Sequence, residues 1–126
     1  MEEVSAFEAG IRQNFNARLR KIYLSVDKKT QAERLEERKR IMKRWKSSMV
    51  DAQAQEKWGE YTFAKKRVLE LTHTPKNPWH VVDSTVRYLA VIECIKILIN
   101  TFPDIADFVS EELKIDLAPN PEVMRL

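Results

Sequence analysis

Apolar residues in the first twenty positions recur with the period of an amphipathic helix. In the segment VSAFEAGIRQNFNARL, residues 4–19, the side chains Val4, Phe7, Ile11 and Phe15 are three or four positions apart. This spacing places them along one side of a helix. The pattern therefore predicts that the chain opens with a helix.

Two short apolar runs predict β-strands. Residues 22–26 (IYLSV) and 79–82 (WHVV) are rich in β-branched and aromatic side chains, as strands are. The first run is nearly uninterrupted, which is typical of a buried parallel strand. A turn rich in proline, threonine and asparagine, residues 72–78, precedes the second run. We expect Asp83 and Ser84 to cap the helix that follows.

The region between the two strands has a helical and strongly charged pattern. Thr30 is followed three positions later by Glu33, which is the spacing of a capping box, so a helix is expected to begin there. A further helix is expected from near Asp51. Its aromatic and aliphatic residues form one stripe that we expect to be core: Trp58, Tyr61, Ala64, Val68 and Leu71.

The segment RYLAVIECIKILINTF, residues 87–102, predicts a last long helix that is apolar on most sides and therefore buried. Its Cys94 is the only cysteine; no cationic neighbour is evident to activate it, so we expect a buried, unreactive thiol. After Pro103 we expect a short helix and then a loose tail.

Together these elements predict a helix-rich α/β fold in which two short parallel strands carry an inserted helical hairpin. Two strands alone make a poor sheet, with exposed edges. We therefore expect further strands from another chain or a larger domain. Without them, a strand edge and an apolar face of the last helix would be exposed, which favours self-association.

Composition limits the function classes. The chain has 126 residues, 33% of them charged, and only two glycines, a balance that suits one helix-rich domain. No apolar run reaches the length of a signal peptide or membrane span, so we expect a soluble, cytoplasmic protein without membrane contact. His73 and His80 lack the companions that a metal site needs.

The positive charge is concentrated between positions 28 and 46, where nine basic residues face three glutamates. One interpretation is a solvated helix with glutamate–arginine pairs at helical spacing. The other is a surface for a polyanion, either nucleic acid, an acidic membrane face or a phosphate chain. The basic residues are Lys28, Lys29, Arg34, Arg38, Lys39, Arg40, Lys43, Arg44 and Lys46.

Two segments resemble, in order and spacing, the carboxy-terminal half of the polyphosphate kinase 2 family: residues 22–38 and residues 43–82. The second segment includes KRWK at 43–46 and THTPKNPWHVV at 72–82. The resemblance covers about Val4 to Pro103. It implies the carboxy-terminal part of a P-loop kinase-like three-layer sandwich. Residues 1–104 would form a partial domain with a mobile lid hairpin at about 28–72, and residues 105–126 a tail.

The same resemblance implies an activity. The family transfers a terminal phosphate between inorganic polyphosphate and a nucleoside mono- or diphosphate, with Mg²⁺. By position, Arg34 and Arg38 match its lid arginines, and Lys43, Arg44 and Lys46 match its basic lid segment. These five are the expected polyphosphate-binding residues, and we identify no catalytic residue and no Mg²⁺ ligand.

The chain also departs from the family. Neither the glycine-rich phosphate loop (Walker A) nor the acidic magnesium motif (Walker B) is present in the sequence. The lid segment KRIMKRW is about one residue shorter than in the family, and of a basic run entering the last helix only Arg87 remains.

Three hypotheses follow. The chain is a phosphotransferase fragment that is inactive alone and works with a companion chain carrying the phosphate loop; or it is a non-catalytic module that binds a polyanion or a partner through its basic 28–46 face; or, least favoured, it is a nucleic-acid binder.

Overall fold

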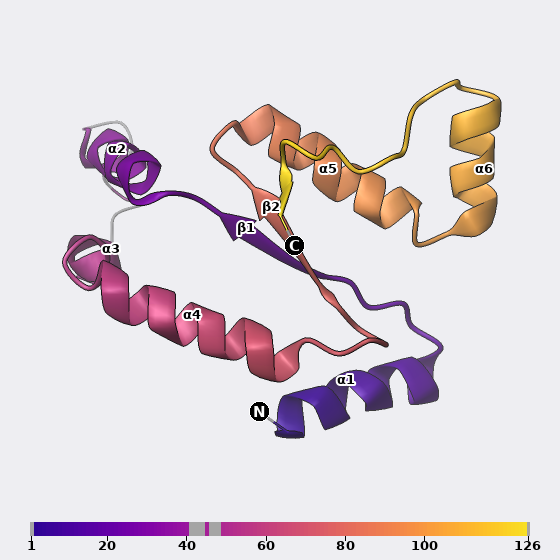
Figure 1. Ribbon diagram of the computed structural model, residues 1–126, viewed down its shortest axis with the longest axis horizontal. Coiled ribbons are helices and arrows are strands. Elements are labelled where there is room, and N and C mark those ends of the chain that lie inside the picture. The colour runs from indigo at the N-terminus through magenta and orange to yellow at the C-terminus, as the bar shows by residue number, and fades with distance from the viewer. Residues whose placement is uncertain (1, 41–44, 46–48, 126) are drawn as a thin grey trace. The chain divides into compact units, whose positions relative to one another are not determined.

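The computed structural model describes residues 2–40, 45 and 49–125 (Figure 1). The chain divides into two compact units. One unit combines Met1–Ser25 with Thr72–Leu126, and the other is Val26–Leu71. We call them the sheet unit and the inserted unit.

The sheet unit contains a three-stranded sheet in the order β1-β2-β3. Strands β1 (Lys21–Ser25) and β2 (Trp79–Asp83) are parallel, with Lys21 opposite Trp79, and this pairing confirms the predicted parallel strands. Strand β3 (Met124–Arg125) runs antiparallel along the other side of β2. The sequence pattern missed β3 because two residues are too few to establish an alternation.

Three helices belong to the sheet unit: α1 (Glu2–Phe15), α5 (Arg87–Ile99) and α6 (Pro103–Glu111). All three were predicted. The small core lies where α5 packs on the sheet, and the partly buried side chains of Ile22, Leu89 and Met124 adjoin it. Its buried members are Val82, Ala90, Ile97 and Val123.

The sheet-facing side of α5 is buried, but its opposite side is exposed. Ala90 and Ile97 are 3% and 8% exposed, whereas Ile95 and Leu98 are 49% and 53% exposed. The expectation that this helix is buried on most sides is therefore wrong, and the expectation of an exposed apolar face is confirmed. The apolar stripe of α1 is also largely open, with Phe7 68% exposed.

The start of α5 differs from the prediction. Its N-cap is Val86, which forms no side-chain capping bond. The Ser84 hydroxyl donates instead to the carbonyl oxygen of Ser25 at the end of β1 (3.2 Å), and the Asp83 carboxylate accepts from the Thr85 amide (2.9 Å). Asp83 and Ser84 therefore stabilise the backbone at the end of β2, and the N-cap position of α5 is Val86.

The chain after α6 is packed, so the expectation of a loose tail is wrong for the residues described. Leu117 and Val123 are buried. The Asp83 amide donates to the carbonyl oxygen of Val123 (2.8 Å), and β3 follows at once. In the part of the chain that the structure describes, no helix has the length and apolar character needed to cross a bilayer.

The inserted unit contains α2 (Lys28–Lys39), α3 (Met49–Ala54) and most of α4 (Trp58–Thr72). The Asp27 carboxylate caps α2 by accepting from the Thr30 amide (2.6 Å). The helix therefore starts before Thr30, which is not its cap. The predicted helix from Asp51 is two helices, and Tyr61 and Val68 on the expected core stripe are 46% and 42% exposed.

Candidate functional site

The basic face of the inserted unit starts on α2, whose Arg34 and Arg38 are one helical turn apart. Arg34 is half-buried, and Arg38 is exposed. The Arg38 guanidinium forms an ion pair with the Asp51 carboxylate of α3 (2.9 Å). The two side chains are 45% and 22% exposed, so solvent reaches this pair and another anion can compete for Arg38.

The other three predicted site residues, Lys43, Arg44 and Lys46, lie outside the described residues. Trp45, which they flank, is 79% exposed. The structure thus tests the position of only two of the five predicted polyphosphate-binding side chains, and it places both on α2.

Two residues for which the sequence pattern predicted no role at this face, Gln55 and Asp51, make its side-chain contacts. The Gln55 side-chain amide donates to the Lys28 carbonyl oxygen (3.1 Å) and to the Gln31 side chain (2.9 Å). It thereby ties the start of α2 to the turn before α4. Asp51 positions the Arg38 guanidinium. None of these three hydrogen bonds could be predicted from local sequence, because the partners are 27, 24 and 13 positions apart.

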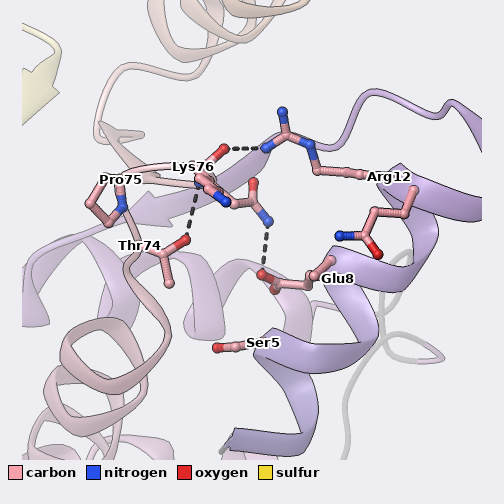
Figure 2. A pocket seen from close by; sticks show the side chains of 9 residues that line it. Ser5, Glu8, Arg12, Thr74, Pro75 and Lys76 are labelled. Carbon is pink, nitrogen blue, oxygen red and sulfur yellow. Dashed lines mark hydrogen bonds between the residues drawn. The ribbon is translucent and has the colours of Figure 1, made fainter.

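A second polar site lies in the sheet unit, between α1 and the turn before β2. A pocket of about 530 Å³ is lined there by Ser5, Glu8 and Arg12 from α1 and by the turn residues Thr74–Asn77 (Figure 2). The Asn77 side-chain amide donates to the Glu8 carboxylate (2.8 Å), and the Arg12 guanidinium donates to the Lys76 carbonyl oxygen. The turn is thus held against α1 by side-chain hydrogen bonds.

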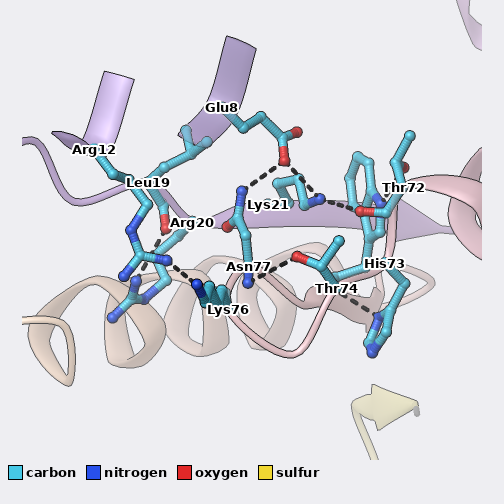
Figure 3. Close-up of polar contacts among 11 residues, drawn as sticks. Glu8, Arg12, Leu19, Arg20, Lys21, Thr72, His73, Thr74, Lys76 and Asn77 are labelled. Carbon is cyan, nitrogen blue, oxygen red and sulfur yellow. Dashed lines mark hydrogen bonds and ion pairs between the residues drawn. The ribbon is translucent and has the colours of Figure 1, made fainter. Parts of the chain in front are cut away.

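Lys21 joins this network from β1 (Figure 3). Its ammonium group forms an ion pair with the Glu8 carboxylate (3.0 Å) and donates to the Thr72 carbonyl oxygen. It also lies 5.3 Å from the centre of the Trp79 ring, whose indole N–H donates to the Thr72 hydroxyl (2.8 Å).

The Lys21 side chain is buried (6% exposed), and the Glu8 side chain is largely buried (13% exposed). The Glu8 oxygen that binds Lys21 also accepts from Asn77. These hydrogen bonds and the ion pair orient the turn that leads into β2. The observed contacts therefore give the network a positioning role.

His80 lies on β2 and lines a smaller pocket of about 250 Å³ together with Arg20 and Glu93. Burial, and secondly the positive charge of Arg20, lower the pKa of His80 below its ordinary value of 6.5. The other histidine, His73, accepts a hydrogen bond from the Trp79 amide (3.3 Å). Among the described residues, no group of three histidine, cysteine or acidic side chains could hold a metal ion.

The low pKa of His80 predicts a pH dependence of stability. As the pH falls through 6.5, the unfolded chain binds a proton at His80 before the folded chain does. The free energy of unfolding should therefore decrease as the pH falls from about 7.5 to about 5. Urea unfolding of the wild type and His80→Gln over this range should show a shallower decrease for the variant. Identical slopes would contradict this assignment.

Cys94 is half-buried, not fully buried as expected. Burial, and secondly the charge of Glu93, raise the pKa of its thiol. A thiol that resists ionisation is a weak nucleophile, which agrees with the predicted lack of reactivity.

Comparison with known proteins decides the family. The family model described as polyphosphate kinase 2 matches residues 1–107. The chain belongs to the polyphosphate kinase 2 family. A GDP-polyphosphate phosphotransferase of Mycobacterium tuberculosis is 34% identical over 106 residues, which is 83% of this chain and 35% of that protein. An ADP-polyphosphate phosphotransferase of Pseudomonas aeruginosa is 39% identical over 62 residues, 49% of this chain and 20% of that protein.

A solved structure agrees with the polyphosphate kinase 2 fold. The crystal structure of polyphosphate kinase 2 from Arthrobacter aurescens TC1 superposes with a TM-score of 0.68 and 24% identity. The match covers 95% of this chain and 42% of that chain. The predicted fold class, a helix-rich part of a P-loop kinase-like fold, is thus confirmed. This chain spans about a third or less of the length of the two curated relatives.

Proposed function

We propose that this chain supplies the polyphosphate-binding part of a phosphotransferase that moves phosphate between inorganic polyphosphate and a nucleotide. The observation that carries the proposal is the pair Arg34 and Arg38, one turn apart on α2, in a member of the polyphosphate kinase 2 family. Polyphosphate repeats its negative charge along the chain, and guanidinium groups bind phosphate oxygens in pairs of hydrogen bonds.

Binding of polyphosphate by arginine and lysine side chains is a direct contribution to phosphoryl transfer. Phosphoryl transfer depends mainly on positioning the reactants and neutralising the charge that spreads over the phosphoryl oxygens. In the proposed complex Arg38 exchanges its Asp51 partner for a phosphate, so that binding the polyanion releases a carboxylate. By the family resemblance, Lys43, Arg44 and Lys46, which lie outside the described residues, are proposed to bind the same anion. Residues 28–72 are proposed to act as a lid that excludes water from the reacting phosphates.

The proposed function needs components that the 126 residues do not contain. The described residues offer no set of ligands for the Mg²⁺ that the family implies, so no step through a metal is assigned to this chain. The phosphate loop is absent from the sequence. We propose that a phosphate-loop part supplies both, and that this chain alone binds polyphosphate without turning it over.

The names of the two relatives indicate the class of nucleotide that accepts the phosphate. The two relatives described above are named for GDP and ADP respectively, so a diphosphate acceptor is the proposed class. The alternative function is a binding module that retains the basic face and has no enzymatic role. Two departures from the family favour this alternative. The sequence lacks the phosphate loop, and it keeps only one basic residue, Arg87, of the family's basic run before the last long helix.

Binding of long-chain polyphosphate by the purified chain is the first test. Arg34→Ala and Arg38→Ala should each weaken binding by about ten-fold, because each removes a charge-assisted contact. Isothermal titration calorimetry at fixed salt measures the effect. Lys66→Ala is the matched control, since it removes one exposed positive charge from α4, outside the 28–46 face, and should change the affinity little. Asp51→Asn should strengthen binding by freeing Arg38.

Turnover distinguishes the two candidate functions. ATP or GTP formation from polyphosphate and the diphosphate is measured with the chain alone and with the amino-terminal part of the Pseudomonas aeruginosa relative added. Activity only in the mixture, lost in Arg38→Ala, supports the phosphotransferase. Polyphosphate binding without activity supports the binding module. Equal affinity for polyphosphate and RNA at matched salt, unchanged in both arginine variants, would refute the proposed substrate class.

A further inference from the structure

The segment after α6 runs back along α5 and ends beside β2 (Figure 1). We call residues 112–125 the strap. Among residues 112–124, the buried side chains are Leu117 and Val123, which are 9% and 4% exposed. The strap is therefore held through two apolar anchors that are six positions apart.

Three side chains of α5 contact main-chain groups of the strap. The Lys96 ammonium group donates to the Ala118 carbonyl oxygen (2.9 Å), and the Asn100 side-chain amide donates to the Leu117 carbonyl oxygen (3.0 Å). The Glu93 carboxylate accepts from the main-chain amide at position 120 (3.3 Å). The three helix residues are three and four positions apart, so they lie on one face of α5.

Strand β2 also contacts the strap through main-chain groups. The Asp83 amide donates to the Val123 carbonyl oxygen (2.8 Å), and β3 pairs with Val81 and Val82. Main-chain hydrogen bonds provide affinity for an extended segment of any sequence, and pockets for its anchor side chains provide specificity. The groove between α5 and the outer edge of β2 therefore has the features of a site for an extended peptide.

The strap occupies this groove only in part. Strand β1 pairs with all five residues of β2, whereas the register of β3 covers Val81 and Val82. A pocket of about 250 Å³ also remains where α5, β2 and the strap meet, lined in part by His80 and Leu117. A segment with a longer strand, and with a side chain that enters this pocket, would make more contacts than the strap does.

We propose that the groove between α5 and β2 binds an extended segment of a partner polypeptide, and that the strap is a detachable segment that occupies it in the free chain. The partner segment adds a strand to β2 and places an apolar side chain where Leu117 lies. The groove lies within residues 1–107, which the family model matches, and the strap follows them. The proposal does not depend on polyphosphate binding by the inserted unit.

A fluorescein-labelled peptide with the sequence of residues 113–126 tests the groove. Its binding to the full chain is measured by fluorescence anisotropy. Leu117→Asp should bind it at least about ten-fold more tightly than the wild type, because release of the chain's own strap raises the fraction of open grooves. Leu117 lies outside the core cluster. The matched control is Leu113→Asp in the same segment, which is 54% exposed and should bind the peptide as weakly as the wild type.

A second substitution assigns the binding to this groove. Asn100→Ala, added to Leu117→Asp, should weaken peptide binding about five-fold, because it removes a hydrogen bond to the peptide main chain. If circular dichroism shows that Leu117→Asp unfolds, Leu117→Ala replaces it and should bind at least about three-fold more tightly than the wild type. Equal affinities of the wild type and the Leu117 variant, or binding insensitive to Asn100→Ala, overturn the proposal.

Lengthening the peptide tests strand addition. Because β3 is antiparallel to β2, residues added after position 126 continue toward the first residue of β2. Adding threonine–valine–threonine should tighten binding to Leu117→Asp at least about three-fold, since these residues favour a strand and lengthen the ladder. Adding glycine–proline–glycine, which disfavours a strand, should not. Equal affinities of the two lengthened peptides would refute strand addition.

Hydrogen exchange of the wild-type chain tests whether the strap detaches without global unfolding. Two consecutive amides bond in opposite directions at the end of β2: Asp83 donates to Val123 of the strap, and Ser84 donates to Ser25 of β1 (2.7 Å). Relative to its intrinsic rate, the Asp83 amide should exchange at least about ten-fold faster than the Ser84 amide. Equal protection of both amides would show that the strap leaves only when the sheet unit unfolds, and would overturn the proposal.

Discussion

Lys21→Met should lower the free energy of unfolding by about 3 kcal/mol or more, the usual cost of removing one partner from a buried ion pair. The variant leaves the Glu8 carboxylate, 13% exposed, without its counter-charge. It also removes the hydrogen bond to the Thr72 carbonyl oxygen and the contact with the Trp79 ring. Urea unfolding followed by tryptophan fluorescence measures the loss.

Two controls separate the buried pair from loss of charge in general. Lys39→Met breaks an ion pair with Glu36 whose side chains are 67% and 70% exposed, and should cost less than about 0.5 kcal/mol. Adding Glu8→Leu to Lys21→Met removes the stranded carboxylate and should recover roughly half of the loss. If Lys21→Met costs no more than Lys39→Met, the network does not hold the turn.

Glu93→Ala should destabilise the sheet unit by about 2–4 kcal/mol, since it removes a buried acceptor and leaves its donors unpaired. Glu93 is 2% exposed although it lies in the most apolar helix. Both of its carboxylate oxygens accept from the Asn120 amide (3.3 Å), and Lys96 lies 3.9 Å away. The carboxylate thus fastens the segment before β3 to α5.

Amide hydrogen exchange locates this effect. In Glu93→Ala the amides of Asp83 and Val123 should lose protection first. The Asp83 amide donates to the Val123 carbonyl oxygen across the β2–β3 edge, and the Val123 amide donates to the carbonyl oxygen of Asn120, which Glu93 holds. Glu93→Gln keeps an acceptor for Asn120 and should cost less than half as much. Uniform loss of protection across both edges of β2 would contradict a local role for Glu93.

The elements that could be predicted are those determined by residues that are close together in the sequence. The strands at 22–26 and 79–82 and the turn between α4 and β2 follow from neighbouring residue types, and the observed strands differ by one residue at their ends. Arg34 and Arg38 share a face of α2 because four residues make about one turn. The family resemblance of the basic segment was likewise carried by contiguous residues.

The polar networks could not be predicted, because their partners are far apart in sequence. Glu8 meets Asn77 across 69 positions, and Lys21 meets Thr72 across 51. A single glutamate inside an apolar run was the only sign of the buried Glu93. Periodicity also shows which side of a helix is apolar but not what covers it, and this is why Tyr61 and Ile95 were expected to be buried and are exposed.

The position of β3 affects how the protein folds during synthesis. Strand β2 lies between β1, which precedes it by the whole inserted unit, and β3, which follows it after α5 and α6. When β2 leaves the ribosome it can pair with β1 only by closing a long loop, which slows folding. Its second edge stays open until residues 124 and 125 have been made. For that interval the nascent chain exposes an unpaired strand edge, to which a chaperone that shields such edges could bind.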